Sequence, residues 1–83
     1  MSLQATLELL DMLIEDHSIP KNVRLSLSKI KDMLKNASKD ELPVKIDAAM
    51  QIIEAISSDP NLPSFTRTQI WNLTSLLESI NNQ

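Results

Sequence analysis

Apolar residues recur at helical spacing in the first part of the chain. On a wheel with about 100° between residues, one side carries Leu3, Leu7, Leu10, Leu13 and Ile14, and the other carries Gln4, Glu8, Asp11 and Glu15. This pattern predicts an amphipathic helix over residues 3–17. We expect it to stop near His17, because Pro20 disfavours helical geometry at Ile19 and cannot continue the hydrogen-bond ladder.

A second amphipathic helix is predicted from Pro20 to about Asn36, with the proline as its first residue. Its apolar stripe consists of Val23, Leu27, Ile30 and Leu34. Its outer face is basic and carries Lys21, Arg24, Lys31 and Lys35. The first two helices would therefore set an acidic face beside a basic one.

The polar stretch that follows, residues 36–41, is the expected connection to a third helix over about 41–57. Ser38 and Glu41 have capping-box spacing, but Asp40 as the cap would place Pro43 in the first turn, so we favour Asp40. Apolar residues cover well over half of this helix, which predicts neighbours on more than one side. A fourth helix is expected from Pro63 or Ser64 to Ile80, with Phe65 beside its core stripe.

The two halves of the chain repeat each other at an offset of 43 residues. The elbow Asp16–Arg24 corresponds to Asp59–Arg67, with Pro20 matching Pro63, and the apolar positions keep their phase on both sides. Neither helical hairpin can bury its stripe alone. The sequence therefore predicts a single all-α domain over 1–83: an antiparallel four-helix bundle built from two repeated αα-hairpins, 1–39 and 40–83, with pseudo-twofold symmetry.

Composition narrows the function classes. The 83 residues contain no Gly and no Cys, which argues against phosphate-cradling loops, disulfides and cysteine-based zinc sites. We expect no signal peptide, because Glu8 and Asp11 interrupt the apolar N-terminal run, and no apolar run approaches about 20 residues, so we expect a cytoplasmic protein without membrane contact. His17 is the sole histidine; we expect it to cap a helix or to be partly buried, and we predict no catalytic, metal or cofactor-binding residues and no cofactor.

Arg24 and Arg67 each follow an elbow proline by four residues, in the first turn of a helix. A cation there opposes the helix dipole, so a second interaction should compensate. The simpler interpretation is a salt bridge to Asp16 or Asp59 that locks the elbow. The alternative is a symmetry-related pair that binds an anion such as phosphate.

Trp71 lies about 100° from the core residue Ile70, and Ser28 occupies the corresponding position in the first half. Hairpin packing therefore does not require an aromatic residue there. Either Trp71 folds against a neighbouring helix, with Arg67 stacked on it, or it anchors a protein interface.

Residues 56–71 resemble the signature of uncharacterised protein family 0147, a family of small archaeal helical proteins. The match runs through Asp59-Pro60-Asn61-Leu62-Pro63, Thr66-Arg67-Thr68 and Ile70-Trp71, and residues 14–24 are similar to the family's first elbow. The resemblance implies a small cytoplasmic helical protein of archaeal type and supplies no active site.

These patterns predict a non-enzymatic interaction or structural module that binds a protein partner or a second copy of itself. The candidate contacts are Trp71, Arg67 and Arg24. The alternative is binding of nucleic acid or another anion through the basic face formed by Lys21, Lys31 and Lys35, although the net charge of −3 opposes it.

Overall fold

A computed structural model describes residues 3–81, which fold into four α-helices with no strand in that range. The helices are α1 (Leu3–Ile14), α2 (Lys21–Lys35), α3 (Leu42–Ser57) and α4 (Ser64–Asn81). The all-α prediction is confirmed for the described residues. None of the helices found there is both long and apolar enough to cross a membrane.

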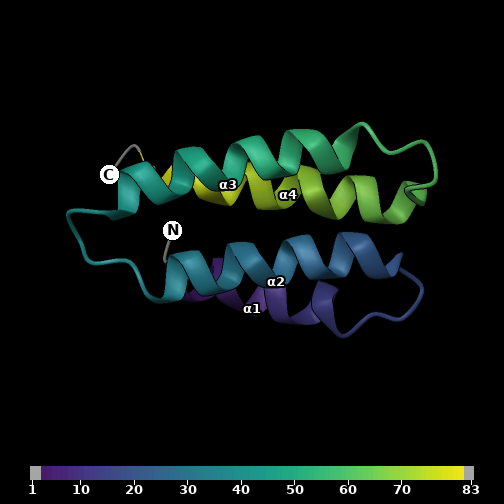
Figure 1. Cartoon of the computed structure of the whole chain (residues 1–83), viewed down its shortest axis with the longest axis horizontal. Coiled ribbons are helices and arrows are strands. Elements are labelled where there is room, and N and C mark those ends of the chain that lie inside the picture. Colours follow the sequence, from purple (N-terminus) through teal and green to yellow (C-terminus); the bar gives the residue numbers. More distant parts are fainter. Residues whose placement is uncertain (1–2, 82–83) are drawn as a thin grey trace.

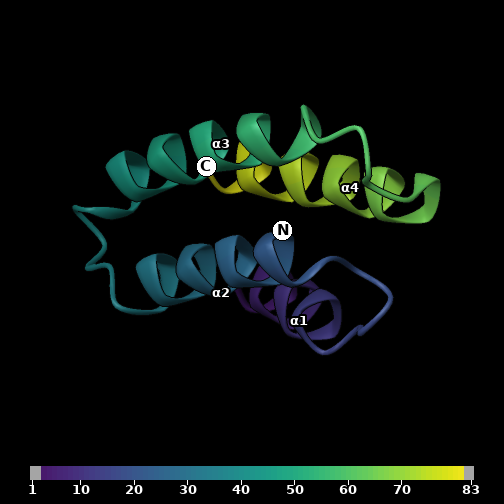
Figure 2. The same ribbon diagram turned by 45° about the vertical axis from the view of Figure 1, so that its right-hand side comes forward.

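Each helix packs against two others, in the order α1–α2–α3–α4 and back to α1. Consecutive helices run in opposite directions, so the α1–α2 and α3–α4 elbows share one end and the α2–α3 connection lies at the other (Figures 1 and 2). The wide apolar arc predicted for α3 is explained by this arrangement, since α3 contacts both α2 and α4.

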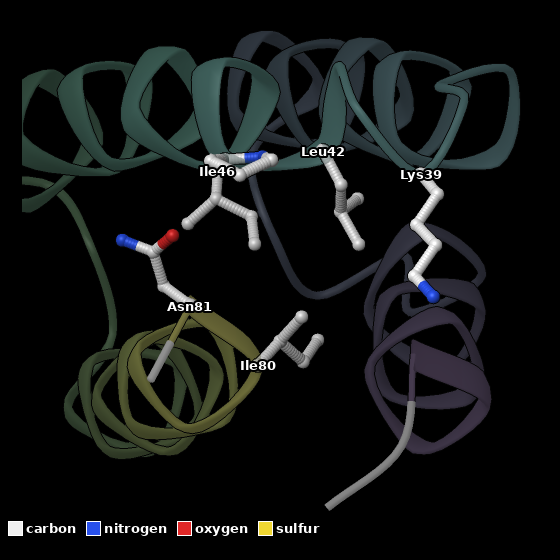
Figure 3. Close-up of a pocket in the computed structure, with 6 residues that line it drawn as sticks. Lys39, Leu42, Ile46, Ile80 and Asn81 are labelled. Carbon is white, nitrogen blue, oxygen red and sulfur yellow. The ribbon is translucent and has the colours of Figure 1, made fainter. Parts of the chain in front are cut away.

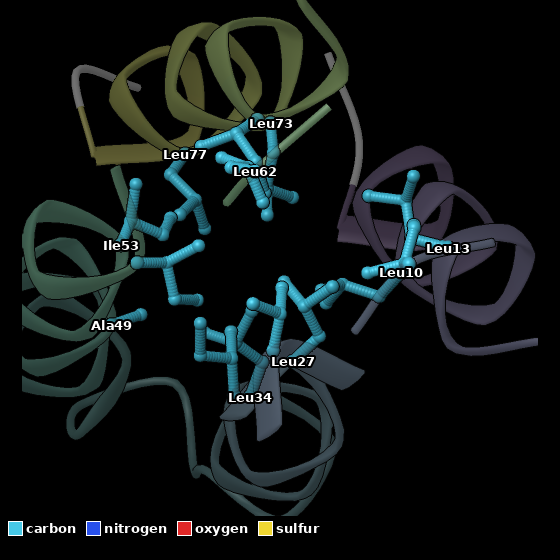
Figure 4. Packing of buried hydrophobic residues seen from close by; sticks show 14 of the residues in the cluster. Leu10, Leu13, Leu27, Leu34, Ala49, Ile53, Leu62, Leu73 and Leu77 are labelled. Atoms are coloured by element: carbon cyan, nitrogen blue, oxygen red, sulfur yellow. The ribbon is translucent and has the colours of Figure 1, made fainter. Parts of the chain in front are cut away.

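One aliphatic core fills the space between the helices (Figure 4). It contains Leu10, Leu13, Ile19, Val23, Leu27, Ile30, Leu34, Ile46, Ala49, Ile53, Ile56, Leu62, Ile70, Leu73 and Leu77. Every helix contributes part of its predicted stripe, and each elbow contributes one buried residue, Ile19 or Leu62. The elbows are therefore packed parts of the core.

The helix boundaries correct three expectations. α1 ends at Ile14, because the Asp16 N–H turns back to the Leu13 carbonyl at 3.2 Å and leaves the helical ladder. Pro20 is the N-cap of α2, with extended backbone geometry, and Lys21 is its first helical residue. His17 is exposed beyond the end of α1.

The start of α3 uses the capping box of Ser38 and Glu41 in place of the predicted Asp40 cap. The Glu41 carboxylate accepts the Ser38 N–H at 2.9 Å, and the Glu41 N–H donates to the Ser38 hydroxyl at 3.3 Å. The helix proper begins at Leu42, directly after Glu41, and Pro43 still falls in the first turn. Ser38, and not the predicted Asp40, is the capping residue, because the reciprocal pair satisfies the backbone N–H groups of both Ser38 and Glu41.

Thr6 is fully buried, and its hydroxyl has no hydrogen-bond partner in the part of the chain that the structure describes. A buried hydroxyl without a partner costs about 1–3 kcal/mol. We expect Thr6→Val to raise the free energy of unfolding by about 1 kcal/mol, since valine keeps the shape and removes the polar atom. Urea denaturation measures the change. Thr68→Val is the matched control, because the Thr68 hydroxyl is exposed and donates to the Ser64 carbonyl; an equal gain in both variants would contradict this account.

Candidate functional site

The two elbows are built from the same parts. The Asp16 carboxylate accepts the Ser18 N–H at 2.9 Å, and the Asp59 carboxylate accepts the Asn61 N–H at 2.9 Å. In each elbow the buried apolar residue then returns its N–H to the aspartate carbonyl, at 3.1 Å for Ile19 and 3.3 Å for Leu62. Each aspartate therefore forms an Asx turn, in which its carboxylate is already hydrogen-bonded to the loop backbone.

Arg24 and Arg67 reach back into their elbows, but their acceptors differ from those we predicted. The Arg24 Nε donates to the Ile19 carbonyl at 3.0 Å. The Arg67 guanidinium donates to the Ser57 carbonyl at 2.9 Å and to the Asp59 carbonyl at 2.8 Å. The predicted salt bridges to the aspartates do not form, because these backbone carbonyls at the end of α3 and in the loops lack helical partners.

The local hydrogen bonds shift the acid strength of two carboxyls. The hydroxyl of Ser18, and then its backbone N–H, hold the pKa of Asp16 below its ordinary value. The backbone N–H and the hydroxyl of Ser38 lower the pKa of Glu41 in the same way. In both cases the partners stabilise the ionised form, so these carboxylates serve turns and caps.

The predicted basic face on α2 is only partly free. The Lys31 ammonium forms a salt bridge with the Asp11 carboxylate of α1, and its hydrogen bond to that carboxylate raises the pKa of Lys31. The Arg24 side chain is half-buried at the elbow, while Lys21 and Lys35 are exposed. Those two lie at opposite ends of α2, about 21 Å apart along the axis.

The outer face of α4 differs in character. Trp71 is 77% exposed, which is high for the largest apolar side chain in the protein. Phe65, expected beside the core stripe, is 60% exposed. The wheel explains this correction, because Phe65 precedes Ile70 by five residues and so points about 140° away from it.

The concave sites are shallow. One lies at the end of the molecule opposite the elbows, between the start of α3 and the end of α4 (Figure 3). It is lined by Lys39, Leu42, Pro43, Ile46, Ile80 and Asn81. Residues 3–81 contain no group of three or more His, Asp or Glu side chains placed to hold a metal ion. The feature that stands out is therefore the exposed face of α4.

The fold and its surface define a small, all-α, four-helix protein. The chain belongs to Uncharacterised protein family (UPF0147), which it matches over residues 1–80. It is 47% identical over 78 residues to a UPF0147 protein of Archaeoglobus fulgidus, covering 94% of this chain and 87% of the relative. A UPF0147 protein of Methanosarcina acetivorans is 47% identical over 74 residues, covering 89% and 75%. The family resemblance predicted from the elbows is confirmed.

Two solved structures share the fold. The "Crystal structure of unknown function protein MMP1188" superposes with a TM-score of 0.84 at 39% identity, covering 93% of this chain and 86% of that one. A UPF0147 protein from Thermoplasma acidophilum gives a TM-score of 0.82 at 30% identity, with coverage of 93% and 89%. The family is uncharacterised, so these relatives establish the fold and assign no activity.

Proposed function

We propose that this protein is a cytoplasmic, non-enzymatic protein-interaction module whose contact surface is the outer face of α4. The observation that carries the proposal is the 77% exposure of Trp71. A tryptophan left in water forgoes the burial of a large apolar surface, roughly 150–250 Å². Packing among residues 3–81 leaves most of this side chain uncovered, so contact with another surface would account for its position.

The surroundings of Trp71 suit such a contact. α4 carries only two charged side chains in 18 residues, Arg67 and Glu78. α2, the helix in the corresponding place, carries Lys21, Arg24, Lys29, Lys31, Asp32 and Lys35 in 15 residues. Interface centres are enriched in aromatic residues and depleted of charge, because charged groups are costly to desolvate. The face of α4 has that composition, and the face of α2 does not.

The second candidate function is binding of nucleic acid or another anion through the basic face of α2. The exposure of Lys21 and Lys35 favours it. Against it, Lys31 is held by Asp11 and Arg24 by the Ile19 carbonyl. Such binding would weaken steeply as salt rises, and its absence at low salt would remove this candidate.

We further propose that the fold is a bundle of two duplicated αα-hairpins related by a pseudo-twofold axis. Its support is the burial pattern, which repeats at the 43-residue offset. Leu10, Leu13, Leu27, Ile30 and Leu34 are buried, and so are their counterparts Ile53, Ile56, Ile70, Leu73 and Leu77. Both elbows also use the same aspartate turn. On this proposal, the exposed residues of α2 and α4 have diverged while the buried residues of the two hairpins have kept the same pattern.

Affinity capture tests the interaction function. Immobilised wild type, Trp71→Ala and Leu25→Ala are exposed to the same archaeal cell extract, with captured chains identified by mass spectrometry. Leu25 is the matched control, since it is 62% exposed on α2 and also apolar. We expect specific capture by the wild type and Leu25→Ala, with at least about 30-fold less by Trp71→Ala. Equal capture by all three would contradict the proposal.

A further inference from the structure

Six residues form a continuous stripe along one flank of α4, the flank from which Arg67 reaches the end of α3; we term it the α4 stripe. They are Ser64, Arg67, Trp71, Thr74, Glu78 and Asn81. Their spacing is three, four, three, four and three residues, which keeps side chains on one line as in the seam of a coiled coil. All are exposed except Thr74, which is half-buried. The stripe thus presents one continuous line of side chains to a partner.

We propose that the α4 stripe binds a second copy of this chain, with the two α4 helices antiparallel across a twofold axis between residues 72 and 73. This deepens the proposed function by naming its partner. Antiparallel pairing at that register sets Trp71 opposite Thr74 of the second copy and Arg67 opposite Glu78. Ser64 then meets Asn81. The stripe is complementary to itself, because the spacing between its residues is the same in both directions along the helix. An isologous contact requires this symmetry.

Charge placement supports a second copy over an unrelated protein. The two charges of α4 have opposite sign and stand at mirrored positions about the proposed axis. Each Arg67 therefore meets a carboxylate of the other copy, and the contact contains two such pairs. The Arg67 guanidinium is held against the elbow by its hydrogen bonds to the Ser57 and Asp59 carbonyls, so the carboxylate of the second copy pairs with the N–H groups that these two bonds leave free.

The residues of α2 that correspond to the α4 stripe cannot form an equivalent contact between two α2 helices. These positions hold Lys21, Arg24, Ser28, Lys31 and Lys35. An equivalent antiparallel register would set Arg24 opposite Lys35 of the second copy, so like charges would meet. Repulsion of this kind is how a protein distinguishes a correct contact from a wrong one. The chain can therefore pair through α4 and not through α2.

The size of the contact predicts a reversible dimer. α4 is 18 residues long, or about 27 Å. One pair of helices of that length buries less than the roughly 1,200–2,000 Å² of a stable interface. The inferred dimer should consequently dissociate on dilution.

Sedimentation velocity over a concentration series, up to about 1 mM, tests this inference. We expect the wild type to shift from monomer to dimer. Trp71→Ala should weaken the dimer by at least about 30-fold, and Glu78→Arg by about 10-fold, because it faces Arg67 with a second cation. Asp32→Arg makes the same charge change at an exposed position of α2, which lies diagonally across the bundle from α4, and should leave the dimer unchanged. Circular dichroism verifies that each variant is folded.

A wild type that stays monomeric throughout would overturn the inference, as would a dimer weakened equally by Asp32→Arg and Glu78→Arg. Failure here is distinguishable from failure of the proposed function. If the wild type stays monomeric but still captures a different protein through Trp71, only the inference that the partner is a second copy fails. If Trp71→Ala changes neither the capture nor the dimerisation, both the proposed function and the second-copy inference are wrong.

Discussion

Leu77→Ala is expected to lower the free energy of unfolding by about 2–5 kcal/mol, since Leu77 is fully buried in α4 and faces the shared core. The loss combines the transfer energy of the removed carbons with the cavity that they leave. In a domain of 83 residues this is a large part of the total stability. Urea denaturation followed by circular dichroism measures it.

If the two hairpins are duplicates, the corresponding residue of the first half should contribute equally to stability. Leu34, the counterpart of Leu77, is also fully buried, in α2. Leu34→Ala should therefore cost about the same, within roughly 1 kcal/mol. Ile80→Ala serves as the control, because Ile80 is half-buried beside the shallow site at the end of α4 and should cost less. A loss for Leu34→Ala no greater than that for Ile80→Ala would show that the two halves do not carry the core equally.

Arg67→Met is expected to destabilise the protein by about 2 kcal/mol. The guanidinium satisfies two backbone carbonyls, one at the end of α3 and one in the elbow. Methionine preserves most of the apolar stem but no donor. Hydrogen bonds from a charged group contribute about 1.5–3 kcal/mol when shielded, and the exposure of Arg67 reduces that figure.

Arg24→Met is the matched comparison at the first elbow. Arg24 makes a single such bond, to the Ile19 carbonyl, so we expect a cost of about 1 kcal/mol. Arg67→Lys should recover only part of the loss, because an ammonium cannot reproduce the two-pronged geometry. If thermal unfolding places Arg67→Met level with the wild type, the guanidinium does not stabilise the elbow and the anion-binding interpretation of this pair gains ground.

Much of the fold could be predicted from local pattern. Helical periodicity located all four helices, and the two prolines located both elbows, because a missing N–H and a fixed φ act on the immediate neighbours. The stripe residues Leu27, Ile30 and Leu73 are buried as their wheel positions indicated. Prediction from local sequence succeeds here because the apolar face of each helix packs against a single shared core.

Details that depend on competition between partners could not be predicted in this way. The choice between Asp40 and Ser38 as a cap, and between carboxylates and carbonyls as acceptors for Arg67, is settled by three-dimensional proximity. The sequence marked Trp71 as anomalous, and its exposure required the positions of the neighbouring helices. Three further exposed apolar residues, Met12, Leu25 and Val44, were not singled out as exposed from the sequence. Their wheel positions relative to the buried stripe were the available signal.

Arg67 has both a structural role and a proposed role in binding. Its guanidinium anchors the second elbow through the Ser57 and Asp59 carbonyls, and its place on the α4 stripe puts a charge one turn before Trp71. The same residue thus positions the start of α4 and supplies part of its outer surface. Its counterpart Arg24 holds the first elbow next to a stripe of like charges, where no pairing of copies is expected.

The most direct measurement of the central claim is quenching of Trp71 fluorescence by acrylamide as the protein is diluted. Trp71 is the single tryptophan and the chain has no tyrosine, so the signal reports on the α4 stripe alone. If the stripe is a contact surface between copies, Trp71 is shielded at high concentration and becomes fully accessible on dilution, with the transition displaced to higher concentration in Glu78→Arg. Equal accessibility at every concentration would contradict the claim.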